Sequence, residues 1–298
     1  MGRGMRQFMK KIITILMSIL TLMLVAFSGV GCSIEWQFES DGKFKYYYIS
    51  SKDGYRIVGT EETGFSDPMY VPAYYKGKLI YNIMHQETGY MGGQVTWAID
   101  YGSAKKIYYP FSIAYMIDFV STREIYITST QSVVSYSMLG AYDQRDVESG
   151  IELEEIYLTS KRYNELKQEV VNKNDINLKY LGKKFLEYNI FEGYLEIRLY
   201  GTEVNFAIVK VANTSYIFNY EGAPNNGYFF INNFEDGALI ENTPYVPLRE
   251  GYTFAGWYKE EACINKCDFD IDVYEEQYDE NGQLIFNELK LYAKWVEK

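Results

Sequence analysis

Three short segments of this chain repeat one pattern, and this pattern limits the folds open to it. Each segment begins with a charged residue, continues with an isoleucine–tyrosine pair and ends at a turn; the segments are Lys106–Ser112, Glu124–Ser129 and Glu155–Ser160. Their starts lie 18 and 31 residues apart. Stacked strand–turn units bury a face that no single unit can bury alone. The pattern therefore predicts a mainly β chain with minor α structure, in which these units form an irregular solenoid.

Other β-type runs and two helical segments complete the expected elements. The runs, separated by Gly, Asp, Asn and Ser turns, are Phe44–Ile49, Leu79–Met84, Gln94–Ile99, Leu195–Tyr200 and Val204–Val211. Apolar residues at three- and four-residue spacing predict a helix over Lys161–Val171 with Ser160 as its cap. Leu178–Glu187 is a second helical candidate, weakened by Gly182.

The region before the repeated segments carries a family resemblance. Tyr55-Arg56-Ile57 is followed by Val71 to Ile83, which contains the turn Lys76-Gly77-Lys78. This part resembles the opening of the BspA-like leucine-rich repeats of bacterial surface proteins, in which a glycine–lysine turn feeds the first rung. The alanine–phenylalanine and cysteine marks of those repeats are missing. The resemblance implies a leucine-rich-repeat-like module over residues 44–211, and the alternative is an ordinary β domain.

The C-terminal part carries a more specific motif. Pro244-x-x-Pro247-Leu248-Arg249-Glu250-Gly251-Tyr252-Thr253-Phe254-Ala255-Gly256-Trp257-Tyr258 is closed by Leu291-Tyr292-Ala293-Lys294-Trp295. This motif resembles the Listeria–Bacteroides repeat, or internalin-type B-repeat, over residues 215–298. The resemblance implies a small β-grasp-like domain, which we expect to fold alone around Tyr252, Phe254, Trp257 and Trp295. Val273 to Asn287 departs from the pattern as an acidic hairpin that turns at Asp279-Glu280-Asn281-Gly282.

The first 32 residues predict where the protein is located. Met1 to Lys11 is basic, Ile12 to Phe27 is almost wholly apolar, and small residues precede Cys32. This order is typical of a secretory signal, and its end resembles the lipobox of bacterial lipoproteins. The resemblance implies that residues 1–31 are a signal peptide, that Cys32 is lipidated, and that 32–43 is a tether. The protein is then an extracytoplasmic, surface-exposed membrane lipoprotein; the alternative is a retained membrane anchor.

Charge and cysteine content restrict the partners. Removing the signal leaves 25 basic and 40 acidic residues (29 − 4 = 25), a net charge of −15, which repels phosphate backbones and makes nucleic acid an unfavourable partner. Apart from Cys32, the chain has only Cys263 and Cys267. Two free thiols are the first interpretation, a local disulfide the second and a metal site the third, since one histidine supplies few further ligands.

No pattern identifies catalytic chemistry. His85 is the only histidine, and its context favours a polar residue at a strand end. The calcium-loop template is not met by Asp268, Asp270 and Asp272, because its sixth and twelfth positions do not match. The simpler interpretation is that these acids form the solvent-exposed face of an extended segment. We expect no metal and no cofactor. A glycan hydrolase with an unrecognised carboxylate pair is the catalytic alternative, and a structural envelope protein is another.

Tyrosine is the outlier of the composition, with 31 residues that often stand in pairs. Adjacent strand residues point to opposite faces, so each pair places one ring outward if the other is buried. Tyrosine offers a large contact area at low entropic cost. The sequence therefore predicts a non-catalytic binding or adhesion module for a protein or glycan, with Tyr74, Tyr75, Tyr108 and Tyr126 as the first contact residues.

Overall fold

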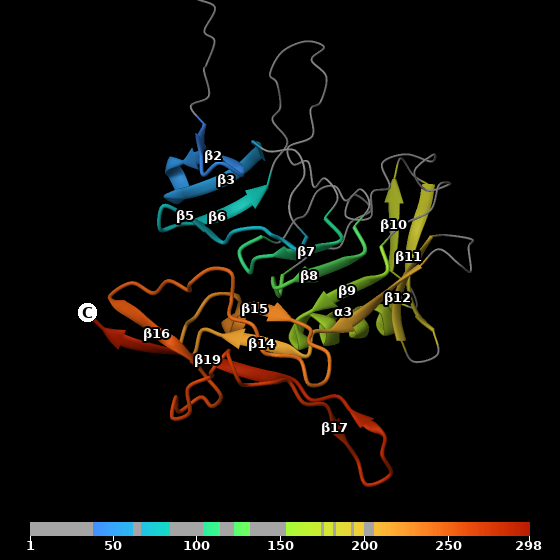
Figure 1. The fold of residues 1–298 in the computed structure, drawn as a ribbon. Coiled ribbons are helices and arrows are strands. Elements are labelled where there is room, and N and C mark those ends of the chain that lie inside the picture. The colour runs from blue at the N-terminus through green and yellow to red at the C-terminus, as the bar shows by residue number, and fades with distance from the viewer. Residues whose placement is uncertain are drawn as a thin grey trace, which may run out of the picture. The chain divides into compact units, whose positions relative to one another are not determined.

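The computed structural model describes residues 38–61, 67–83, 104–113, 122–131, 153–173, 176–180, 183–191, 194–199 and 206–298. Phe38–Lys298 forms one compact unit. The described residues are mainly β, as the sequence predicts, and the α-helix among them is α3 (Ser160–Lys173) (Figure 1). Cys32, His85 and the expected strand Gln94–Ile99 lie outside the described residues.

The first sheet has the strand order β1-β2-β3-β6-β5. Its strands are β1 (Glu39–Ser40), β2 (Phe44–Ile49), β3 (Gly54–Thr60), β5 (Tyr74–Tyr75) and β6 (Lys78–Ile83), and the 3-10 turn η1 (Ser50–Lys52) joins β2 to β3. The strands expected at 44–49 and 79–84 are confirmed as β2 and β6. Lys76 and Gly77 both have positive φ, 48° and 74°, and form the two-residue β5–β6 turn. β1 lies in the segment predicted as tether and pairs with β2.

The second sheet has the order β10-β11-β12-β13-β9-β8-β7-β4. Its strands are β4 (Met69–Tyr70), β7 (Lys106–Tyr109), β8 (Glu124–Ile127), β9 (Glu155–Leu158), β10 (Ile176–Tyr180), β11 (Lys183–Phe191), β12 (Tyr194–Leu199) and β13 (Phe206–Val211). The pairs from β4 through β7, β8 and β9 to β13 are parallel. We call these five strands the parallel stack. Each repeated isoleucine–tyrosine segment is thus confirmed as one strand, and the expected strands at 195–200 and 204–211 are confirmed as β12 and β13.

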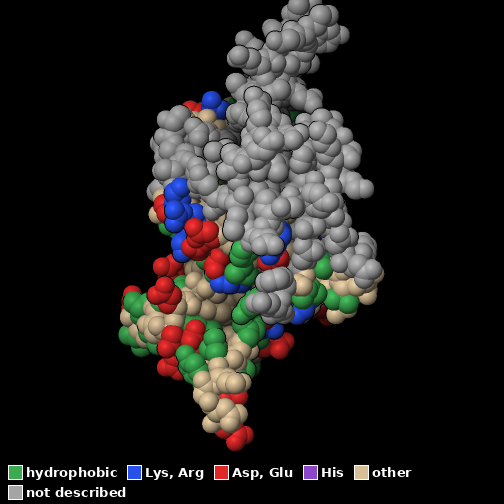
Figure 2. Space-filling view, turned by 90° about the vertical axis from the view of Figure 1, so that its right-hand side faces the viewer, with side chains coloured by type: hydrophobic (Ala, Val, Ile, Leu, Met, Phe, Trp, Pro, Cys, Tyr) green, Lys and Arg blue, Asp and Glu red, His purple; other side chains and the backbone are tan. Residues whose placement is uncertain are grey.

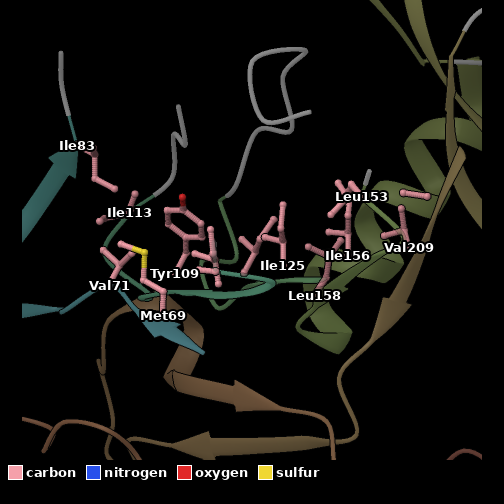
Figure 3. Close-up of a cluster of buried hydrophobic side chains, with 14 of the residues drawn as sticks. Met69, Val71, Ile83, Tyr109, Ile113, Ile125, Leu153, Ile156, Leu158 and Val209 are labelled. Atoms are coloured by element: carbon pink, nitrogen blue, oxygen red, sulfur yellow. The ribbon is translucent and has the colours of Figure 1, made fainter. Parts of the chain in front are cut away.

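One face of the parallel stack forms a continuous apolar core. Ile107, Ile125 and Ile156 are aligned in register across β7, β8 and β9, and all three are fully buried. Figure 3 shows this layer, with side chains from successive strands on the same side of the ribbon; its labelled members are Met69, Val71, Ile83, Tyr109, Ile113, Ile125, Leu153, Ile156, Leu158 and Val209. The isoleucines of the repeated pattern therefore hold the stack together.

The helix α3 follows β9 and packs on the same core through Leu166 and Val170. Its first turn is capped by Thr159, whose Oγ1 accepts a hydrogen bond from the backbone N–H of Arg162 at 3.2 Å. Ser160, predicted as the cap, is instead the first helical residue. In the part of the chain that the structure describes, no helix has the length and apolarity needed to cross a membrane.

The second predicted helix, Leu178–Glu187, is wrong. The chain forms the antiparallel strands β10 and β11 there, with Ile176 opposite Tyr188. Strand β11 also pairs with β12 on its other side. Pairing with strands farther along the chain overrides the local helical pattern.

The C-terminal part forms a four-stranded sheet in the order β15-β14-β19-β16, with a separate hairpin. The strands are β14 (Thr214–Ile217), β15 (Tyr228–Asn232), β16 (Tyr252–Tyr258) and β19 (Leu289–Glu297), and the 3-10 turn η3 (Asn225–Gly227) precedes β15. The central pair β14–β19 is parallel and the outer pairs are antiparallel. The predicted acidic hairpin is confirmed as β17 (Gln277–Tyr278) and β18 (Leu284–Ile285).

The motif residues of this sheet mostly take the expected places. Trp257 is fully buried, and Phe254 and Trp295 pack against its cluster, but Tyr252 lies outside that cluster. Gly256 has a φ of 120° at a bulge of β16, and a Cβ there would lie 2.8 Å from Lys266 Cε. The positive φ therefore requires glycine here, whereas the flexible end of the Lys266 side chain can move to make room for a Cβ.

Candidate functional site

Four tyrosines form a stacked row across the parallel stack. The ring centroids of Tyr70 and Tyr108 are 4.8 Å apart, those of Tyr108 and Tyr126 are 4.2 Å apart, and those of Tyr126 and Tyr157 are 4.5 Å apart. The ring planes of the last two pairs are nearly parallel, with interplanar angles of 13° and 6°. The row follows from the repeated pattern, because the tyrosine occupies the same register position in each strand.

The C-terminal sheet covers this tyrosine row. Phe230 of β15 stacks on Tyr108 at 5.4 Å, and the Tyr108 hydroxyl donates a hydrogen bond to Asn232 Oδ1 at 2.9 Å. Tyr108 and Tyr126 are only 6% and 2% exposed. The prediction that these two rings point outward is therefore wrong: they belong to one aromatic core shared by the parallel stack and the C-terminal sheet.

The tyrosine pair at the end of β7 shows why the prediction failed. Tyr109 is buried in the isoleucine core, and Tyr108 is buried in the aromatic core on the opposite face. A parallel sheet covered on both faces has no outward side at its centre. Strand alternation correctly separates the two rings, but it does not reveal that a distant segment covers the second face.

Tyr74 and Tyr75, the other two predicted contact residues, are half-buried. The ring of Tyr74 packs near Phe111, 6.0 Å between centroids, and burial raises its pKa. The ring of Tyr75 stacks on Tyr46 at 3.9 Å and meets Tyr55 edge-on at 4.9 Å. Both rings are therefore partly buried against the cores, and the structure gives these tyrosines packing roles.

Charged side chains surround the ring of Tyr75. Lys76 forms an ion pair with Glu39, and its ammonium lies 5.4 Å from the Tyr75 ring centroid. The Tyr75 hydroxyl donates to the backbone oxygen of Ser40 at 3.1 Å, and the Tyr55 hydroxyl donates to Glu39 at 3.1 Å. These bonds tie β1 to β3 and β5, which is a structural task.

Two glutamates lie side by side on the tyrosine face of the parallel stack. Glu124 and Glu155 are register partners in β8 and β9. Lys106 Nζ lies 3.0 Å from Glu124, and Lys210 donates to Glu155. Burial alone would raise the pKa of Glu155, but hydrogen bonds from Lys210 and Tyr157 outweigh it and hold the pKa below the ordinary value. A glycosidase acid needs a raised pKa, so Glu155 is poorly suited to that role.

Polar contacts join the C-terminal sheet to the rest of the chain. Ser160 Oγ donates to Glu288 Oε2 at 3.0 Å, and Ser215 Oγ donates to the other oxygen of this carboxylate at 2.6 Å. At a second point, Asn225 Oδ1 accepts the backbone N–H of Thr130 at 2.7 Å. These hydrogen bonds join the C-terminal sheet to helix α3 and to the segment that follows β8.

The hairpin β17–β18 exposes apolar side chains. Tyr278, Leu284 and Phe286 are 55%, 58% and 56% exposed, and Ile285 is nearly as open. Figure 2 shows hydrophobic and acidic side chains together over the lower part of the molecule, where Figure 1 places the C-terminal strands. Exposed apolar groups gathered on one element are typical of contact surfaces. We call residues 275–286 the hairpin surface.

The acids and thiols near this hairpin form no metal site. Among the described residues, no three or more His, Cys, Asp or Glu side chains gather at ligating distance. Asp268 and Asp272 lie in a turn, where the backbone N–H of Asp272 donates to the Asp268 oxygen at 2.8 Å, so the expected extended segment is wrong. Cys263 and Cys267 are free thiols.

Comparison with known proteins supports one part of the chain. Residues 216–294 match the family model of the Listeria-Bacteroides repeat domain. This match confirms the resemblance of the C-terminal part. No curated protein and no solved structure matches the chain.

Sequence reasoning missed the hairpin surface as a candidate site. It identified the acidic hairpin and its turn, but it gave contact roles only to tyrosines of the N-terminal part. The available signal was the run Leu284-Ile285-Phe286, three consecutive apolar residues beside a polar turn. A two-stranded element cannot bury both of its faces by itself, so such a run predicts exposed apolar groups.

Proposed function

We propose that this protein is a non-catalytic bacterial surface lipoprotein that binds a protein or glycan partner through the hairpin surface. The observation that carries the proposal is the exposure of Tyr278, Leu284 and Phe286 on an element that projects from the C-terminal sheet. The tyrosines of the parallel stack are used internally. Binding through the hairpin surface leaves the two cores intact.

The strand arrangement supports display of this surface on a repeat-type scaffold. The five-stranded parallel stack with aligned isoleucines agrees with an irregular leucine-rich-repeat-like solenoid. The order β15-β14-β19-β16 with a parallel central pair agrees with a β-grasp-like domain. Both architectures carry contact surfaces on rigid strands, which suits adhesion.

Cys32 anchors the protein to the membrane in this proposal. Two or more acyl chains on this residue give stable anchoring, because each buried methylene contributes about 0.8 kcal/mol. Replacing Cys32 with alanine removes acyl labelling. Labelling that persists in the Cys32→Ala protein contradicts the lipoprotein assignment.

A screen of glycans and surface proteins against residues 33–298 tests the binding proposal. The screen is run in parallel with Leu284→Gln/Phe286→Gln and with Val246→Gln, a control of equal exposure (57%) elsewhere in the C-terminal part. A ligand that binds the parent and the control, but not the double variant, supports the proposal. Ligands that bind all three proteins equally, or hydrolysis of a glycan by all three, contradict it.

A further inference from the structure

Three of the four exposed apolar side chains of the hairpin surface share one face, and Ile285 lies on the other. Tyr278 and Leu284 are register partners across β17 and β18, so their side chains share a face. Phe286 follows Leu284 by two residues, which extends that face along the chain. The Tyr278 hydroxyl is held by Glu276, to whose Oε2 it donates at 2.6 Å. The face therefore combines three apolar groups with a fixed carboxylate.

The same segment is strongly acidic. Residues 267–289 contain eight carboxylates and no lysine or arginine. Among the described residues, Glu275, Glu276, Asp279 and Glu280 form no ion pair with a cation. An apolar face surrounded by uncompensated negative charge is complementary to a surface with apolar and basic groups.

The hairpin also has open strand edges. Within the described part of the chain, β17 and β18 have only each other as neighbours. Apart from the Glu276 N–H, which donates to Asp236 Oδ1 at 2.9 Å, backbone N–H and C=O groups on the outer edges are therefore positioned to pair with an added extended segment. Strand addition gives affinity through the backbone, while alternate side chains meet the apolar face.

A second copy of this chain is a poor occupant. Two such hairpins would bring sets of uncompensated carboxylates together, and like charges at close range oppose association. The partner that fits is another protein with the opposite charge. A neutral surface would leave the carboxylates desolvated without compensation.

We propose that the hairpin surface binds an extended, basic segment of another protein in which lysine or arginine alternates with apolar residues. This inference rests on the proposed binding function and names the chemical class of the partner. The apolar side chains of the segment cover Tyr278 and Leu284, and its cations, which alternate to the opposite face, meet Glu275.

The test is fluorescence anisotropy of residues 33–298 with a labelled octapeptide of alternating lysine and valine. An octapeptide of alternating glutamate and valine is the control ligand. We expect the lysine peptide to bind and the glutamate peptide not to bind. Leu284→Gln/Phe286→Gln weakens binding about tenfold or more, whereas Val246→Gln changes it by less than about twofold.

Charge reversal separates this site from general attraction to an acidic protein. Glu275→Lys and Glu250→Lys change the net charge equally, and both residues are exposed. We expect Glu275→Lys to weaken binding at least about fivefold and Glu250→Lys by less than about twofold. Equal effects of the two variants overturn the proposal.

Two further outcomes also overturn it. These are absence of binding to the lysine peptide, and sedimentation that shows dimers of the parent but not of Leu284→Gln/Phe286→Gln, which would make a second copy the occupant. If the screen described above still yields a ligand that requires Leu284 and Phe286, the binding function stands while the basic partner is excluded.

Discussion

Tyr126→Ala tests whether the parallel stack and the C-terminal sheet share one core. Tyr126 is 2% exposed and lies between Tyr108 and Tyr157 in the tyrosine row. Its hydroxyl donates to Glu124 at 2.9 Å. The substitution removes the ring from the centre of the row and leaves a cavity under the C-terminal sheet.

The size of the effect follows from this burial. Replacing a buried aromatic residue with alanine costs about 3–5 kcal/mol. The lost stacking contacts, about 0.5–1.5 kcal/mol per pair, place Tyr126 in the upper half of that range. With a urea m-value of about 3 kcal/mol/M, a loss of 4 kcal/mol lowers the unfolding midpoint by about 1.3 M.

Cys267 reports separately on the C-terminal sheet. It is buried with Trp257 in the shared core, and burial raises the pKa of its thiol to about 12, so it reacts slowly in the folded protein. In the protein of residues 33–298 with the Cys263→Ser substitution, Cys267 is the single thiol. If the core is shared, Tyr126→Ala speeds its labelling about a hundredfold or more, since each 1.4 kcal/mol is tenfold.

Tyr194→Ala is the control, because that ring is 62% exposed and its loss changes stability by less than about 0.5 kcal/mol. A Tyr126→Ala protein with the parent midpoint refutes the burial argument. A lower urea midpoint with an unchanged rate of Cys267 labelling refutes the shared core and indicates that the C-terminal domain unfolds independently.

Three further predictions concern single residues. Gly256→Ala destabilises by about 1–3 kcal/mol in thermal unfolding, more than Gly251→Ala, because the φ of Gly256, 120°, lies farther from the left-handed region near about +57° than the φ of Gly251, 77°; equal effects contradict this. Trp257→Ala costs about 3–5 kcal/mol, and a parent-like melting curve argues against its burial. Because the pKa of Glu155 is lowered in the folded protein, its ionised carboxylate stabilises the fold at pH values above the ordinary glutamate pKa of 4.5, and this stability is lost as the pH falls through the folded pKa. Glu155→Gln therefore makes the unfolding midpoint depend less on pH in this range. An unchanged pH profile of the midpoint counts against this.

The repeated pattern predicts the parallel stack well because its information is local. Each isoleucine–tyrosine segment contains the alternation and the turn that define a strand, and register pairing aligns the isoleucines. Helix α3 is predicted for the same reason, apart from the shift of its cap from Ser160 to Thr159. Leu178–Glu187 fails because β11 is fixed by its neighbours on both sides.

The contact residues could not be predicted in the same way. Whether Tyr108 meets water or Phe230 depends on a strand more than a hundred residues later in the chain. Alternation gives the face of a side chain, but the cover of that face is a tertiary property. The match of residues 216–294 identifies the covering domain, and it contains no information on what that domain packs against.

Amide hydrogen exchange of residues 33–298, with and without the lysine–valine peptide, tests the central claim most directly. The claim is that partners contact the hairpin surface, while the tyrosine row is buried inside the protein. It predicts that the peptide slows exchange at residues 275–286 and leaves residues 74–75 unchanged. Slower exchange at Tyr74 and Tyr75, with the hairpin unaffected, would contradict the claim and return the binding site to the N-terminal tyrosines.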